Sequence, residues 1–296
     1  MFLKKNDIIG IVAPAGFIRK EEDLEHAFTL IKSWGLQVKL SENLFSKHHH
    51  FAGTDDIRTK DFQKLLDDDT IKAIWCVRGG YGSIRIIDKL DFTKFKKHPK
   101  WIIGYSDITV FHHSVFNLGI ESLHSFMPTS TQTVLEDKNA VANLKAILFG
   151  KSISYKINSN KNNKLGKVNG KIIGGNLSII AGLLGTDYAI KDKDFILFIE
   201  EIGEYKYKID SMLQSIKLNG YFKNCKALIL GSFTKIPKNN PLFGQTIEEI
   251  ILEIVKEYDF PVCFDFPAGH IVHNNPIVFG RKVTLNITNK NVTLDF

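Results

Sequence analysis

The chain has 296 residues, 44% of them hydrophobic and 24% charged, which is enough for a proper core in one large domain or two modest ones. The net charge is +7, but no helix-turn-helix pattern or aromatic-interleaved basic strand accompanies it, so we expect no nucleic-acid partner. Three widely spaced cysteines exclude a disulfide framework or a CxxC metal site, and no apolar run approaches the roughly 18 residues of a membrane helix.

The first predicted element is a strand at 8–13. Lys4 and Lys5 followed by this apolar run imitate a secretory signal, but Asn6 and Asp7 interrupt the pattern and leave the run short even for a signal core. We therefore predict a strand that ends in a turn at Pro14, and a cytoplasmic location.

Short apolar strands alternate with helical segments through the first half of the chain. This alternation predicts a parallel sheet covered on both faces, in a Rossmann-like α/β domain. The elements predicted after the first strand are a helix at 21–34 closed by Gly35, a helix at 57–66, strands at 71–77 and 101–103, and a helix at 108–116.

Residues 151–166 are rich in Ser, Asn and Lys, which is typical of a linker. We predict an N-terminal domain at 1–150 and a C-terminal α/β domain with a β-rich part at 167–296. The elements predicted there are strands at 167–173, 195–199, 227–230 and 262–264, helices at 177–184, 209–218 and 246–258, and a hairpin within 277–296 that turns at Asn289-Lys290-Asn291.

The turn Gly104-Tyr105-Ser106-Asp107 lies between a predicted strand and a predicted helix. A serine at such a corner points its hydroxyl away from the core, next to backbone N–H groups that have no partner within the helix. An acyl-transfer nucleophile needs this arrangement, since the N–H groups can bind an oxyanion. The alternative is that Ser106 or Asp107 only caps the helix.

The base for such a nucleophile must come from ten histidines. His48-His49-His50 lies in a polar loop, which we interpret as solvated, and His112 and His113 on the predicted helix are interpreted as packing or surface residues. His270 follows Phe266-Pro267-Ala268-Gly269, just past a predicted strand, where α/β folds place their chemistry.

An acid must orient the base, and Glu200 ends the apolar strand at 195–199. Glu201 and Glu204 follow in the turn before a helix, where acids often only complement the helix dipole. Glu200 is therefore the better candidate.

These segments resemble the LD-carboxypeptidase family of serine peptidases, which also includes the microcin C immunity peptidases. No single segment is diagnostic of the family, but the order and spacing of all the segments along nearly the whole chain are diagnostic. The matching segments are Ile11-Val12-Ala13-Pro14-Ala15, Ala52-Gly53 with Arg58, Arg78-Gly79-Gly80-Tyr81-Gly82, Gly104-Tyr105-Ser106-Asp107, Gly174-Gly175-Asn176-Leu177-Ser178, Leu184-Gly185-Thr186, Ile199-Glu200-Glu201-Ile202-Gly203-Glu204, Tyr207-Lys208-Ile209-Asp210 and Gly269-His270.

The resemblance implies a catalytic triad of Ser106, Glu200 and His270, without metal or cofactor. It also implies a substrate, the cytoplasmic murein tetrapeptide, from which the terminal D-alanine is removed in peptidoglycan recycling. Whether the third peptide residue is diaminopimelate or lysine stays open, as does a homodimer. The chain departs from the family pattern at Glu201, where Asp is common, and at Lys208, where Arg is common.

The Gly-rich turn after the strand at 71–77 is expected to serve the same site. We predict that the oxyanion is bound by the N–H groups of Asp107 and Gly80, because a turn without side chains permits close approach of the backbone. We also predict that Arg78, Gly79 and Tyr105 contact substrate, with Arg78 on its carboxylate; a structural ion pair is the alternative for Arg78.

Two other functions stay open. The first is hydrolysis of microcin C-like peptidyl nucleotides, which calls for an aromatic platform near the site. The second is a non-catalytic phosphate- or sugar-binding module built on the Gly-rich turn, although that turn lacks the GxGxxG and P-loop spacings.

Overall fold

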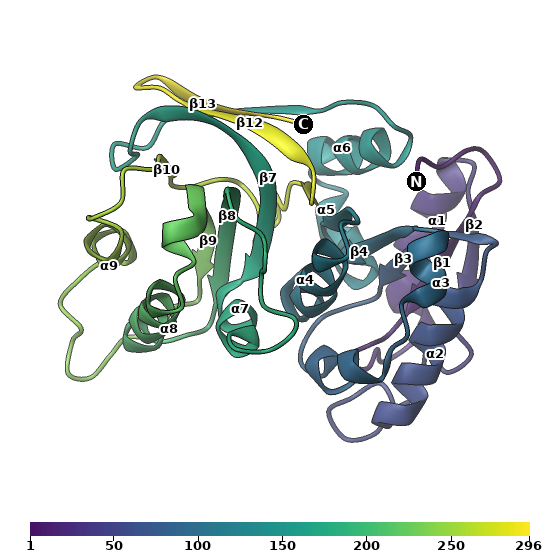
Figure 1. Cartoon of the computed structure of the whole chain (residues 1–296). Helices are drawn as coiled ribbons and strands as arrows, with labels where there is room; N and C mark the ends of the chain where they lie inside the picture. The colour runs from purple at the N-terminus through teal and green to yellow at the C-terminus, as the bar shows by residue number, and fades with distance from the viewer.

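The computed structural model describes residues 1–296 and contains two sheets, each associated with its own helices (Figure 1). The first sheet has the strand order β11-β5-β4-β3-β1-β2. Its strands β1 to β5 are parallel, and β11 is antiparallel at the edge. The strands are β1 (Ile8–Val12), β2 (Gln37–Leu40), β3 (Ile71–Cys76), β4 (Trp101–Gly104), β5 (Ser122–His124) and β11 (Ile277–Phe279).

Helices connect these parallel strands, as the alternating pattern predicts. Thr54 caps α2 by accepting from the N–H of Ile57, and Asp137 caps α6 in the same way. The α-helices are α1 (Glu25–Ser33), α2 (Asp55–Asp67), α3 (Thr93–Lys97), α4 (Thr109–Asn117), α5 (Thr131–Val134) and α6 (Lys138–Leu148); 3₁₀ turns are η1 (Glu21–Leu24), η2 (Ser83–Arg85), η3 (Ile87–Lys89), η4 (Ser106–Ile108) and η5 (Pro128–Ser130).

The second sheet has the order β10-β9-β8-β7-β12-β13-β6, parallel from β10 to β7 and antiparallel beyond. The long strand β7 joins the two parts (Figure 1). Its elements are β6 (Ser154–Asn158), β7 (Gly166–Asn176), α7 (Leu177–Leu183), β8 (Phe195–Ile202), α8 (Lys206–Leu218), η6 (Phe222–Asn224), β9 (Cys225–Thr234), α9 (Ile247–Ile254), β10 (Val262–Cys263), β12 (Lys282–Ile287) and β13 (Asn291–Asp295).

The predicted α/β class is confirmed, and several expectations need correction. The segment 151–166 is not only a linker, because β6 lies within it and pairs with β13. The run that begins at Ile277 does not belong wholly to the C-terminal hairpin, because β11 pairs with β5 in the first sheet. The helix expected at 246–258 is shorter, since α9 ends at Ile254.

The two halves pack through α4, which lies between the sheets (Figure 1). All its residues from Thr109 to Phe116 are buried, and it contacts β5 on one side and β7 on the other. One apolar cluster of 64 buried residues includes side chains from both sheets, so the core is continuous across the interface. No helix has both the length and the apolar character needed to cross a membrane.

Candidate active site

Ser106 lies at the sharp corner between β4 and the short turn η4 that leads into α4. Its φ is +64°, a left-handed conformation that costs a non-glycine residue about 1–3 kcal/mol. Such a strained strand-to-helix turn is how α/β hydrolases expose a nucleophilic hydroxyl. Neither Ser106 nor Asp107 makes a side-chain cap hydrogen bond to η4 or α4. Helix capping therefore does not explain this turn.

The structure brings Ser106, His270 and Glu200 together in one hydrogen-bonded chain. His270 Nε2 lies 3.1 Å from Ser106 Oγ, and His270 Nδ1 lies 2.6 Å from Glu200 Oε2. The Glu200 side chain is fully buried and that of His270 is 14% exposed. This geometry lets an imidazole take the serine proton while a buried carboxylate fixes its tautomer.

The three side chains come from three segments on two sheets. Ser106 follows β4 in the first sheet, Glu200 lies near the carboxyl end of β8 in the second, and His270 lies in the loop after β10. Parallel strands present the residues at their carboxyl ends to ligands, which explains why distant parts of the sequence converge here.

The loop that carries His270 is fixed by a residue that the sequence analysis missed. Asn274 is 1% exposed, and its Oδ1 accepts a hydrogen bond of 2.9 Å from the N–H of Gly269. Gly269 has φ +114°, and an added Cβ would lie 2.6 Å from Ser232 Oγ and 2.8 Å from Glu200 Cβ. An Asn in a loop rich in Gly and Pro is the sequence signal that could have identified it.

Tyr105 packs against His270. Its ring centroid lies 4.8 Å from that of His270, and burial, helped by the negative charge of Glu200, raises its pKa to about 12. Tyr105 is therefore a neutral wall beside the imidazole.

The Gly-rich turn approaches Ser106 through Gly79. A Cβ added to Gly79 would lie 3.1 Å from Ser106 Oγ and 3.3 Å from the backbone N of Asp107. A Cβ added to Gly80 would instead meet Gly16 and His50. The turn therefore lies close enough to Ser106 for its backbone to take part in the site.

Two buried side chains hold this turn in place. Asp107 accepts a 2.8 Å hydrogen bond from the N–H of Ser83, and burial raises the pKa of its carboxyl. The fully buried Arg58 side chain donates to the carbonyls of Pro14 and Gly82 and pairs with Asp55. Both contacts tie loops that follow parallel strands to one another.

Arg78 is exposed and forms no ion pair, so the structural alternative for it is wrong. Its Nη1 donates to the carbonyl of Phe17 over 3.1 Å. It lines a polar pocket of about 420 Å³ that also contains Arg19, Lys20 and His26. This pocket carries cationic groups next to the Gly-rich turn, although Glu22 and Asp23 also line it.

The neighbouring acids and histidines have structural roles. Glu201 is buried on β8 and accepts hydrogen bonds from Asn176 Nδ2 and from the N–H and Oγ of Ser178, so it serves the start of α7 rather than of α8. His112 and His113 are fully buried, and burial lowers the pKa of each to about 4. His48, His49 and His50 are exposed, as expected for a solvated loop. No group of three or more His, Cys, Asp or Glu side chains is placed to hold a metal ion.

Comparison with known proteins places this site in a family. The LD-carboxypeptidase N-terminal domain matches residues 9–125, and the LD-carboxypeptidase C-terminal domain matches residues 169–285. A probable murein peptide carboxypeptidase of Bacillus subtilis is 31% identical over 99% of this chain and 93% of its own length. The murein tetrapeptide carboxypeptidase of Pseudomonas aeruginosa is 26% identical over 94% of this chain and 92% of its own length.

A solved structure agrees with these relatives. The crystal structure of muramoyltetrapeptide carboxypeptidase from Oxalobacter formigenes has a TM-score of 0.88 and 28% identity, and the match covers 97% of this chain and 98% of that one. Fold and relatives together define a two-domain α/β peptidase. The chain belongs to the LD-carboxypeptidase family. It is thus an enzyme, a carboxypeptidase, and not a non-catalytic binding module.

Proposed function

We propose that this enzyme is a serine carboxypeptidase that releases the terminal D-alanine of the murein tetrapeptide during peptidoglycan recycling in the cytoplasm. The observation that carries the proposal is the chain of hydrogen bonds from Ser106 through His270 to the buried Glu200. The murein-directed names of the relatives support the choice of substrate.

In this mechanism Ser106 Oγ attacks the carbonyl of the residue before D-alanine, and His270 Nε2 accepts the hydroxyl proton. Glu200 holds the imidazole with Nδ1–H toward the carboxylate and stabilises the imidazolium. His270 then donates the proton to the leaving amine of D-alanine. Water, deprotonated by the same imidazole, hydrolyses the acyl-enzyme and releases the tripeptide.

The developing oxyanion would be bound by the N–H groups of Asp107 and Gly80. The contact of Gly79 with Ser106 and Asp107 supports this role, since it brings the Gly-rich turn to the nucleophile. Donors of this kind typically contribute about 3 kcal/mol to lowering the barrier.

The substrate is anionic, and we assign its terminal carboxylate to Arg78. The Arg78 guanidinium has no carboxylate partner, and the pocket that it lines adds Arg19, Lys20 and His26. A fork of N–H donors suits a carboxylate better than a point charge does.

The test is D-alanine release from murein tetrapeptide, followed by mass spectrometry without added metal. We expect release by the wild type and a loss of at least about 10⁴-fold in kcat for Ser106→Ala and for His270→Ala, because each removes a member of the triad. Ser215→Ala, which removes an exposed hydroxyl from α8, is the control and should keep full activity. Wild-type activity in Ser106→Ala, with an unchanged melting temperature, would refute the mechanism.

One observation favours a second substrate class, the peptidyl nucleotides. Tyr205 and Tyr207 lie just after β8, are 41% and 48% exposed, and stack with ring centroids 5.7 Å apart. Such a pair could hold a nucleobase. If a peptidyl-adenylate mimic is cleaved faster than the tetrapeptide, and Tyr205→Ala lowers only that activity, this second function replaces the first.

A further inference from the structure

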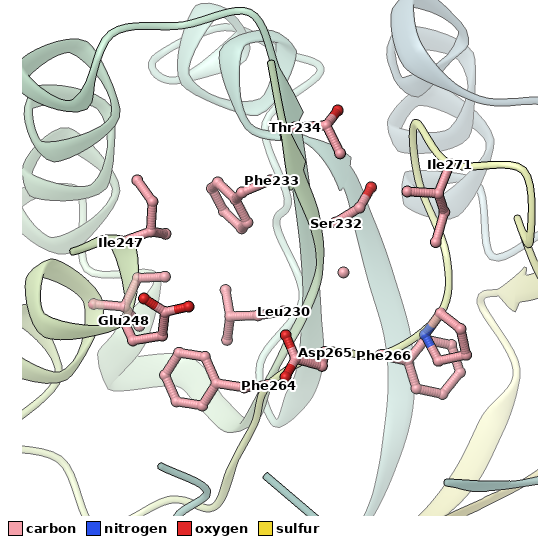
Figure 2. Close-up of a pocket in the computed structure, with 13 residues that line it drawn as sticks. Leu230, Ser232, Phe233, Thr234, Ile247, Glu248, Phe264, Asp265, Phe266 and Ile271 are labelled. Carbon is pink, nitrogen blue, oxygen red and sulfur yellow. The ribbon is translucent and has the colours of Figure 1, made fainter. Parts of the chain in front are cut away.

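A cavity of about 350 Å³ lies beside the active site, between β9, α9 and the segment that leads to His270 (Figure 2). It opens at the carboxyl ends of β9 and β10, which is the edge where parallel sheets bind ligands. Nothing in the proposed mechanism uses this space so far.

Most of the cavity wall is apolar. Leu230, Phe264 and Phe266 are buried side chains that line it, and Phe233 and Ile247 lie near one another between β9 and α9 in Figure 2. An aliphatic chain that entered would lose water-exposed area against these groups, at about 25 cal/mol per Å².

The cavity also contains two carboxylates and no basic side chain. Glu248 extends from the first turn of α9, and Asp265 from the segment after β10 (Figure 2). Neither carboxylate forms an ion pair, and Asp265 accepts only from the amide of Asn160. The Arg78 pocket differs from this cavity, because Arg19, Lys20 and Arg78 line it together with its two acids, Glu22 and Asp23.

The cavity shares its wall with the catalytic loop. Ile271, which lines it, follows His270 directly, and Thr234 donates through Oγ1 to the carbonyl of His270 over 3.4 Å. Ser232, also in the wall, lies against Gly269 next to Glu200. The cavity therefore adjoins the loop that carries His270 and, through Ser232, the surroundings of Glu200.

We propose that this cavity is a subsite for the side chain of the residue whose carbonyl Ser106 attacks, and that it selects an aliphatic chain ending in an ammonium group. The inference rests on the proposed function and specifies its substrate as the tetrapeptide with lysine at the third position. Lysine places its methylenes against the apolar wall and its ammonium between Glu248 and Asp265. Diaminopimelate ends in a carboxylate as well as an ammonium, and that carboxylate would meet two like charges.

The experiment compares three tetrapeptides that differ only at the third residue: lysine, meso-diaminopimelate and norleucine, which keeps the carbon chain without the ammonium. We expect kcat/KM for D-alanine release to be about tenfold higher or more with lysine than with either of the others, equivalent to about 1.4 kcal/mol. The double variant Glu248→Gln/Asp265→Asn should lower kcat/KM for the lysine peptide toward that for the norleucine peptide, mainly by raising KM. The same variant should raise kcat/KM for the diaminopimelate peptide.

Both substitutions keep the size of the side chain, and Asn tolerates the left-handed backbone of Asp265, whose φ is +58°. Glu253→Gln removes the same charge from the exposed face of α9 and should change none of the three values.

The outcomes separate the two proposals. Equal rates on the three peptides, a preference for diaminopimelate, or a double variant that behaves like wild type would overturn the subsite while leaving the carboxypeptidase function intact. Failure of the folded wild type to release D-alanine from any of them would refute the proposed function, and the subsite with it.

Discussion

Ser106 and Gly269, which directly precedes His270, both have a positive φ. Only Ser106 is strained by this conformation, because glycine adopts a positive φ without steric cost. At Ser106 the strain turns the hydroxyl toward His270. At Gly269 the missing side chain leaves room for Ser232 and Glu200.

We predict that Gly269→Ala lowers kcat by about 10²-fold, because a new Cβ would displace Glu200 or the loop that carries His270. Steady-state kinetics on the tetrapeptide would measure the loss. Gly220→Ala is the matched control, since Gly220 has φ +85° but nothing within 4 Å of an added Cβ. Equal kinetics in the two variants would show that the close approach at Gly269 is unimportant.

The residues placed in the triad could be selected from sequence because each follows or ends an apolar strand. Glu200 lies near the end of β8, Ser106 follows β4 and His270 lies in the loop after β10, and the family resemblance selected the same three. Asn274 does not stand next to a strand, and only its place in a loop rich in Gly and Pro points to it. Ser232 has no sequence signal, since its importance depends on a contact with Gly269 that only the folded chain creates. The role of Glu201 was mistaken for a similar reason, because the helix that it serves begins 24 residues earlier, at Leu177.

At the scale of elements, the strands with long apolar runs were predictable from sequence, and the short or polar strands β2, β5, β6 and β11 were not. Strand β6 reads Ser-Tyr-Lys-Ile-Asn, and only Tyr155 is buried, so its composition is that of a loop. Strand β11 pairs with β5, which lies some 150 residues away in sequence. No local sequence pattern reveals this pairing. The strands β3, β4 and β8 are buried on both faces, and their apolar runs identified them.

Arg58, on α2, holds two loops in place through hydrogen bonds to their backbone carbonyls. We predict that Arg58→Met lowers the free energy of unfolding by about 3 kcal/mol, because the carbonyls of Pro14 and Gly82 lose their buried donor. It should also lower kcat about tenfold as the Gly-rich turn loosens. Urea unfolding and steady-state kinetics would measure the two effects.

Arg85→Met is the matched control, because Arg85 also pairs with Asp55 but is 46% exposed. Arg85→Met should lower the free energy of unfolding by less than about 1 kcal/mol. Equal effects of the two substitutions would contradict the role assigned to the buried guanidinium.

At the scale of the whole molecule, three buried histidines make the free energy of unfolding depend on pH. His112, His113 and His124 are fully buried, and burial lowers their pKa values, to about 4 for the first two. Between pH 6.5 and 4 the unfolded chain binds protons at these positions and the folded chain does not. The free energy of unfolding therefore falls as pH falls through this window, by up to about 1.4 kcal/mol per pH unit for each histidine.

We predict that His124→Phe reduces this pH dependence by the share of one histidine, measured by urea unfolding between pH 7.5 and 4.5. The variant should also be at least as stable as wild type at pH 7, because neither ring nitrogen of His124 has a hydrogen-bond partner and Phe198 and Phe279 lie beside the ring. His98→Phe, at an exposed position, should leave the slope unchanged. An unchanged slope in His124→Phe would mean that another group causes the dependence.

The pairing of β11 with β5 also sets an order of events during synthesis. Domains generally fold as they leave the ribosome, N-terminal first. Here the sheet that presents Ser106 receives its edge strand from residues 277–279, made after both Glu200 and His270. A nascent chain therefore carries an unfinished first sheet until nearly all of this sequence has been translated, and the peptidase becomes competent only when both sheets close together.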